Sequence, residues 1–116
     1  MDNGIKLSGN VALVGFEILE PTEIESVKKV VLLYIKKLSE AGSLQELKLT
    51  LQQHPHGKSF KHEINGLVFI NNERIAAAMT DWNIYKAVSD VCEKMYSAAV
   101  HKLKKEQRHD KKTFTS

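Results

Sequence analysis

Two stretches of the chain carry apolar residues at the three- and four-residue steps of an amphipathic helix. In the first stretch, Thr22 and Glu25 have the spacing of a capping box that begins a helix. Gly42 can take the left-handed conformation that ends one. The apolar stripe between them consists of Ile24, Val27, Val31, Tyr34, Ile35 and Leu38.

The second stretch predicts a helix that begins after Asn83, a good N-cap residue. Its apolar stripe consists of Ile84, Val88, Val91, Cys92, Met95, Ala99 and Leu103. A helix from there to Gln107 is about 25 residues long, or ~37 Å at 1.5 Å per residue. Because this exceeds the width of a small sheet, the last turns should project beyond the core.

Between the two helices the pattern changes to the two-residue period of half-buried strands. In LQELKLTLQQ, residues 44–53, leucine alternates with polar residues. Pro55 and Gly57 both break extended pairing, so the segment HPHGKS predicts a turn.

Two further strands are expected, at residues 60–70 and 74–80, with a turn at NNE between them. Asn65-Gly66 is either a hairpin signal or a bulge within a long strand. An early strand lies within residues 5–16, either at IKLS or at VALVGF, and the pattern does not choose between them.

The resulting order, β-α-β-β-β-α, predicts an α+β fold. In this fold a four-stranded, mostly antiparallel sheet carries both helices on one face. The other face stays open to water or to a partner. A chain of 116 residues is long enough for one domain. We expect residues 1–107 to form it and residues 108–116 to be a basic flexible tail.

Positive charge is concentrated near the C-terminus. Residues 101–112 have a net charge of +4, whereas residues 1–100 sum to −1. This end should attract an anionic partner first, and a solvated, solubilising tail is the alternative. No apolar run has transmembrane length, the N-terminus carries no export signal, and a single cysteine agrees with a reducing compartment. We therefore expect a cytoplasmic protein.

Few residues suggest catalysis or metal binding. Cys92 lies on the apolar stripe of the second helix, which favours a packed thiol over a nucleophile. His54, His56 and His62 have no cysteine or carboxylate spaced to complete a zinc site. The sequence has no phosphate-binding loop or nucleophile motif, so we expect no enzyme activity and no cofactor. Tyr85 should close the end of the core, whereas Trp82 could equally well stack on a base.

Several short motifs together resemble those of the ribosome hibernation-promoting factor and ribosome-associated inhibitor family, in its short form. NIYKAV (83–88), EKM (93–95) and the basic HKLKKEQRHDKK (101–112) are similar to the family's second helix, and FEILEPTEIESV (16–27) is similar to its entry into the first. Asn83 stands where the family usually has aspartate, and Ser97 where arginine is common. The resemblance implies a fold like a double-stranded-RNA-binding domain with one extra strand.

The resemblance also implies the function. Such a domain occupies the mRNA and tRNA channel of the small ribosomal subunit, inhibits translation and protects idle ribosomes. The expected partners are the small subunit and its rRNA, with no membrane, no small-molecule substrate and no self-association. The candidate rRNA contacts are Lys28, Lys29, Lys36, Lys37, Lys86, Lys94, Lys102, Lys104, Lys105 and Arg108. Only Lys94 and the basic end follow from the family's motif, and the others follow from their predicted facing. The alternatives are a double-stranded-RNA-binding protein and a small protein-interaction module.

Overall fold

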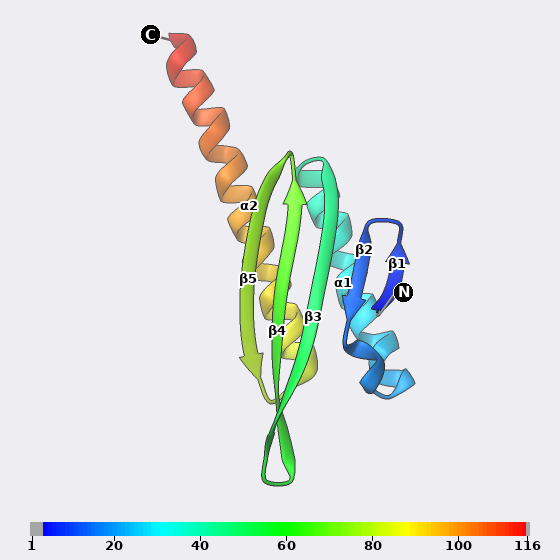
Figure 1. The fold of residues 1–116 in the computed structure, drawn as a ribbon. Coiled ribbons are helices and arrows are strands. Elements are labelled where there is room, and N and C mark those ends of the chain that lie inside the picture. The colour runs from blue at the N-terminus through cyan, green and yellow to red at the C-terminus, as the bar shows by residue number, and fades with distance from the viewer. Residues whose placement is uncertain (1–3, 116) are drawn as a thin grey trace.

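One five-stranded sheet and two long helices make up the structure, a computed structural model that describes residues 4–115 (Figure 1). The elements in chain order are β1 (Gly4–Ser8), β2 (Val11–Val14), the short 3-10 helix η1 (Phe16–Ile18), α1 (Pro21–Ala41), β3 (Leu44–His56), β4 (Ser59–Ile70), β5 (Glu73–Asp81) and α2 (Ile84–Thr115). The strands lie side by side in the order β1-β2-β3-β4-β5. All neighbouring strands are antiparallel except β2 and β3, which are parallel.

The α+β class is confirmed, but the expected four-stranded sheet is wrong. Residues 5–16 hold two strands instead of one, because IKLS and VALV pair with each other across a turn at Gly9 and Asn10. Both alternatives for the early strand are therefore strands. The parallel pairing of β2 with β3 follows from the crossover through α1, which returns the chain to the same end of the sheet.

Both helices lie on one face of the sheet, where they cover its apolar side (Figure 1). Leucines 47, 49 and 51 of β3 point into this core, as the alternating pattern predicts. Val27, Val31, Tyr34 and Leu38 of α1 and Val88, Val91, Cys92, Met95 and Ala99 of α2 are buried against the sheet and against each other. The helices are thus held rigidly with their outer sides exposed.

The helix ends differ in how well the sequence located them. Asn83 caps α2 as expected, since its Oδ1 accepts hydrogen bonds from the backbone N–H groups of Tyr85 at 2.9 Å and Lys86 at 3.1 Å. The capping box of α1 is formed by Glu20 and Glu23, not by Thr22 and Glu25. Gly42 follows α1 in an extended conformation, with φ −173°, and not in the left-handed one.

Gly66 lies in the middle of β4, paired with Leu49 on one side and Ala77 on the other. The register runs through it without a shift, so Asn65-Gly66 is neither a hairpin nor a bulge. A Cβ atom at this position would lie 2.8 Å from both the Sδ and the Cε of Met95. The glycine therefore lets α2 approach the sheet closely.

The β3–β4 hairpin extends beyond the rest of the sheet. Its pairing continues to His56 and Ser59, whereas β5 pairs with β4 only as far as His62 (Figure 1). Pro55 lies within this two-stranded ribbon, so the turn is shorter than HPHGKS predicts, with Gly57 at φ 60°. At the opposite end α2 projects past the sheet and continues through Thr115. The division between a domain at 1–107 and a tail at 108–116 stays a prediction.

Candidate nucleic-acid interface

The outer surface of the helix pair carries exposed lysines. Lys29 and Lys36 are seven residues apart on α1, which is about two helical turns, so both point away from the core. Lys86 and Lys104 are 18 residues apart on α2, or about five turns, and share one side of that helix. Lys94 is exposed on another side of α2.

Three of the predicted contacts are engaged in ion pairs. Lys28 Nζ lies 3.3 Å from Glu25, Lys86 Nζ lies 2.9 Å from Asp90, and Lys102 Nζ lies 3.3 Å from Glu73. The hydrogen bond to Asp90 raises the pKa of Lys86. Exposed pairs of this kind contribute little to stability, because water and salt screen them. A phosphate can therefore replace the carboxylate at little cost.

Four of the predicted rRNA contacts are not paired with a carboxylate in the described part of the chain. No ion pair joins Lys29, Lys36, Lys94 or Lys104 to any side chain that the structure describes. Their ammonium groups are available to an anionic partner. Lys105 and Arg108 lie outside the residues whose side chains are described.

A polar cluster joins the two helices. Tyr34 Oη donates a hydrogen bond of 2.8 Å to Glu93, and Ser97 Oγ donates one of 2.9 Å to the same carboxylate. These hydrogen bonds, with the charge of Lys37, lower the pKa of Glu93. Lys37 Nζ lies 5.0 Å from the ring centre of Tyr34 and 5.3 Å from that of Tyr96. Lys37, a predicted rRNA contact, is thus partly committed to holding α1 against α2.

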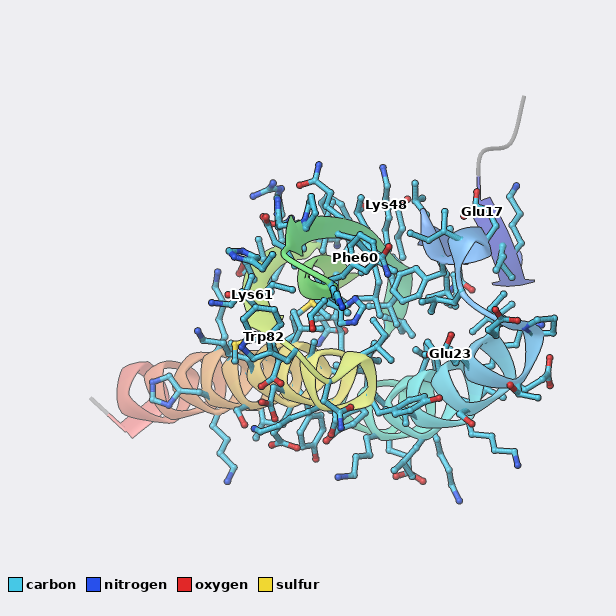
Figure 2. The ribbon with its side chains drawn as sticks, turned by 90° about the horizontal axis from the view of Figure 1, so that it is seen from below. Glu17, Glu23, Lys48, Phe60, Lys61 and Trp82 are labelled. Carbon is cyan, nitrogen blue, oxygen red and sulfur yellow. The ribbon has the colours of Figure 1, made fainter. Side chains whose placement is uncertain are left out.

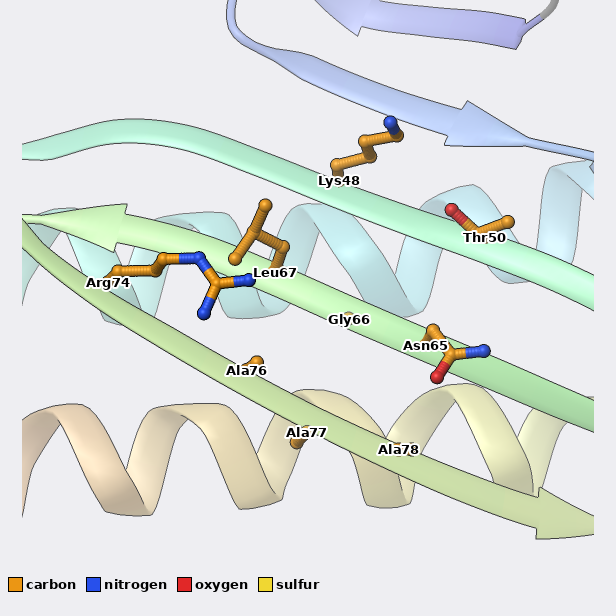
Figure 3. A pocket seen from close by; sticks show the side chains of 9 residues that line it. All are labelled: Lys48, Thr50, Asn65, Gly66, Leu67, Arg74, Ala76, Ala77 and Ala78. Atoms are coloured by element: carbon orange, nitrogen blue, oxygen red, sulfur yellow. The ribbon is translucent and has the colours of Figure 1, made fainter.

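The open face of the sheet carries a second cationic surface, whose residues are not among the predicted contacts. Lys48 of β3 and Arg74 of β5 lie on either side of Leu67 in a shallow depression of about 480 Å³ (Figure 3). The small side chains of Ala76 and Ala78 also line it. The signal was present, because period-two alternation in β3 places Lys48 opposite the buried leucines.

The residues considered for catalysis or metal binding have structural environments. Burial raises the pKa of the Cys92 thiol to about 12, which keeps it protonated and unreactive. His54 Nε2 lies 2.7 Å from Glu63, and His62 Nδ1 lies 3.4 Å from Gln53. Across the described part of the chain, no group of three or more metal-ligating side chains comes together.

Two aromatic residues at the start of α2 are exposed. Tyr85 is 38% exposed, so the expectation that it closes the core is wrong. Trp82, just before the helix, is 53% exposed.

Neither α1 nor α2, over the residues described, is both long and apolar enough to span a bilayer.

Comparison with known proteins identifies the fold. The chain matches no family model and no curated protein sequence. Among solved structures, the N-terminal domain of Protein Y from Thermus thermophilus is similar, with a TM-score of 0.50 over 71% of this chain and 83% of that one. The chain has the fold of the Protein Y N-terminal domain. At 15% identity, the shared fold leaves the details of the surface to be argued from this chain's own residues.

Proposed function

We propose that this protein is a ribosome hibernation factor, which binds the small subunit in its mRNA and tRNA channel, inhibits translation and protects idle ribosomes. The observation that carries the proposal is that a Protein Y-like fold presents exposed lysines on the outer sides of α1 and α2. We call Lys29, Lys36, Lys86, Lys94 and Lys104 the helix-face lysines. Protein Y is a ribosome-associated protein of the hibernation type. The motifs in residues 83–112 resemble the same family.

The physical basis is electrostatic. A rigid pair of helices with outward lysines can replace counterions along rRNA backbones and gain affinity without reading base sequence. Inhibition then requires only that the protein occupy the channel. The candidate contacts are those predicted from the sequence, with Lys29, Lys36, Lys94 and Lys104 first because no described carboxylate neutralises them.

This function needs no catalysis and no cofactor. The structural neighbour is not from an enzyme family, which agrees with the expectation of a non-enzyme. The site of action would be the cytoplasm, where ribosomes are found. Self-association is not expected from this chain alone.

Charge reversal on the helix surface tests the proposal. The double variant Lys36→Glu/Lys104→Glu is compared with Lys48→Glu/Arg74→Glu, which makes the same change of charge on the open face of the sheet. Binding to purified small subunits is measured by co-sedimentation across a series of salt concentrations. Loss of two phosphate contacts should lower affinity by tenfold or more at low salt and reduce the salt-dependence slope by roughly 1.5.

Lys48→Glu/Arg74→Glu should lose less affinity than Lys36→Glu/Lys104→Glu, and both variants should keep the wild-type circular dichroism spectrum. If Lys36→Glu/Lys104→Glu binds small subunits as tightly as the wild type does, these two lysines do not contact the rRNA. A wild-type protein that does not co-sediment with small subunits, or that leaves cell-free translation unaffected, would overturn the proposed function itself.

Double-stranded RNA binding is the second candidate. It is favoured by the run α1-β3-β4-β5-α2, which has the α-β-β-β-α order of a double-stranded-RNA-binding domain. An RNA duplex of about 16 base pairs, the length that such domains span, separates the two functions in a gel-shift assay. Duplex binding without association with ribosomes would favour this candidate.

A further inference from the structure

A groove at the hairpin end of the molecule brings together large apolar side chains that are distant in sequence. We call it the hairpin-end groove, and its principal lining residues are Ile18, Leu19, Glu20, Glu23, Phe60 and Trp82. Its volume is about 580 Å³. Ile18 is 61% exposed, Phe60 50% and Trp82 53%, so these three apolar side chains of the groove meet solvent. Figure 2 looks onto this end of the molecule.

The tryptophan is held in place by its neighbours. The His56 ring meets Trp82 edge-on with 5.2 Å between ring centres, and Lys61 Nζ lies 5.7 Å from the Trp82 centre. The paired ribbon of β3 and β4 fixes Phe60 opposite Pro55. Aromatic groups that are already ordered lose little conformational entropy on binding, which is characteristic of residues that dominate protein interfaces.

The α1 side of the groove is acidic, because Glu20 and Glu23 line it there. Gln53, Ser59 and His62 of β3 and β4 complete the polar lining, and Lys61 Nζ lies over Trp82. The reciprocal capping box fixes both carboxylates, since Glu23 Oε1 accepts the Glu20 backbone N–H at 3.0 Å. Glu17, exposed on η1, adds a further negative charge on the α1 side of this end (Figure 2). The α1 side of the groove therefore favours a cationic group and opposes phosphate, whereas the Trp82 edge already carries the charge of Lys61.

We propose that the hairpin-end groove binds a basic segment of another protein. The segment inserts one apolar side chain between Phe60, Trp82 and Ile18 and places a lysine or arginine beside Glu20 and Glu23. This surface is separate from the helix-face lysines, so the inference does not depend on ribosome binding. Single-stranded RNA, which could stack on the same aromatic rings, is disfavoured by the two fixed carboxylates.

Trp82 is the only tryptophan of the chain, so its fluorescence reports directly on the groove. The full-length protein is titrated at low salt with a synthetic nine-residue peptide of lysine and arginine around a central leucine. Three comparison probes are the same peptide with central alanine, the leucine peptide with glutamate in place of its basic residues, and a nine-nucleotide single-stranded RNA. We expect the basic leucine peptide to bind with a Kd on the order of 100 µM.

Variants assign the binding to the groove. Phe60→Ser should weaken the basic leucine peptide about tenfold, since it removes an aromatic anchor. Glu23→Gln should weaken it roughly threefold at low salt and less at high salt, since the amide oxygen preserves the cap but not the charge. Leu33→Ser, at a residue of α1 that is 53% exposed and does not line the groove, is the matched control and should bind as the wild type does.

Two sets of results overturn the inference. The first is that the acidic peptide or the RNA binds as tightly as the basic leucine peptide or more tightly, or that Phe60→Ser leaves the Kd of the basic leucine peptide unchanged. The second is a Trp82 emission spectrum that stays constant up to about 2 mM basic leucine peptide, roughly twenty times the expected Kd.

Discussion

Replacement of Gly66 tests the close approach of α2 to the sheet. A Cβ atom at Gly66 would lie 2.8 Å from the Sδ and Cε of Met95 and 3.2 Å from Cδ2 of Leu49. Both neighbours are fully buried, so the end of the Met95 side chain has little free volume into which to move. The backbone at Gly66 is not in the left-handed region, so steric crowding is the main cost of a larger residue.

The magnitude follows from the number of atoms added. Overpacking a well-filled core costs about 1–3 kcal/mol, and replacing glycine in a strand by a residue with a side chain returns roughly 0.5–1 kcal/mol. We expect Gly66→Ala to lower the free energy of unfolding by about 1 kcal/mol. Gly66→Val adds a branched side chain, and we expect a loss of about 3 kcal/mol, or ~12 °C in melting temperature for a domain of this size.

The assay is urea denaturation followed by Trp82 fluorescence and by circular dichroism, arranged as a double-mutant cycle with Met95→Ala. Met95→Ala alone should cost about 2–5 kcal/mol because it leaves a cavity. In that background Gly66→Val should cost less than about 1 kcal/mol, since the cavity accepts the added methyl groups.

Gly9→Ala is the control. A Cβ atom at Gly9 would have no atom within 4 Å, so its stability should stay within about 0.5 kcal/mol of the wild type. If Gly66→Val costs the same in both backgrounds, the contact with Met95 is not the reason for the glycine.

Three further perturbations have defined outcomes. Gly15→Ala should cost about 2 kcal/mol or more in urea denaturation, because Gly15 has φ 83° and its Cβ would lie 2.5 Å from the carbonyl oxygen of Leu51. Tyr34→Phe should cost about 1 kcal/mol by removing the hydrogen bond to Glu93. The folded-state pKa of Glu93 lies below its usual 4.5, so ionised Glu93 stabilises the fold above pH 4.5, and this contribution is lost as the pH falls through the folded-state pKa. When denaturation is repeated across acid pH, Tyr34→Phe should therefore lose less stability on acidification than the wild type does. Cys92 should react with a thiol reagent only as fast as the protein opens, and rapid labelling of the folded protein would contradict its burial.

Local signals in the sequence located most of the elements. Asn83 was identified as the cap of α2 because its side chain bonds to the next turn of the same helix. The N-cap of α1 was predicted two residues too late, because Thr22 and Glu25 fit the usual capping-box pattern whereas glutamate, the actual N-cap residue at position 20, is not a preferred cap. Pro21 favours the earlier start, since proline is well suited to the first helical position. The fifth strand was missed because β1 and β2 are only five and four residues long.

Surface chemistry was predictable only in part. Helical periodicity placed Lys29 and Lys36 on the outside of α1, as the structure has them. The ion pair of Lys102 with Glu73 and the placement of Phe60 and Trp82 in one groove depend on how different elements pack, which a single sequence does not specify. The exposure of Tyr85 could not be read from its helical position, since core closure depends on which residues of the sheet lie beneath it.

The parallel pairing of β2 with β3 has a consequence for the order in which the molecule assembles. The hairpins β3–β4 and β4–β5 each close through a turn of two residues, whereas β2 meets β3 only after the chain has passed through the whole of α1. Closing a loop of about 30 residues costs roughly 3 kcal/mol of chain entropy. We therefore expect the β1–β2 hairpin to dock late in folding, and its amide protons should exchange with solvent before those of the other strands.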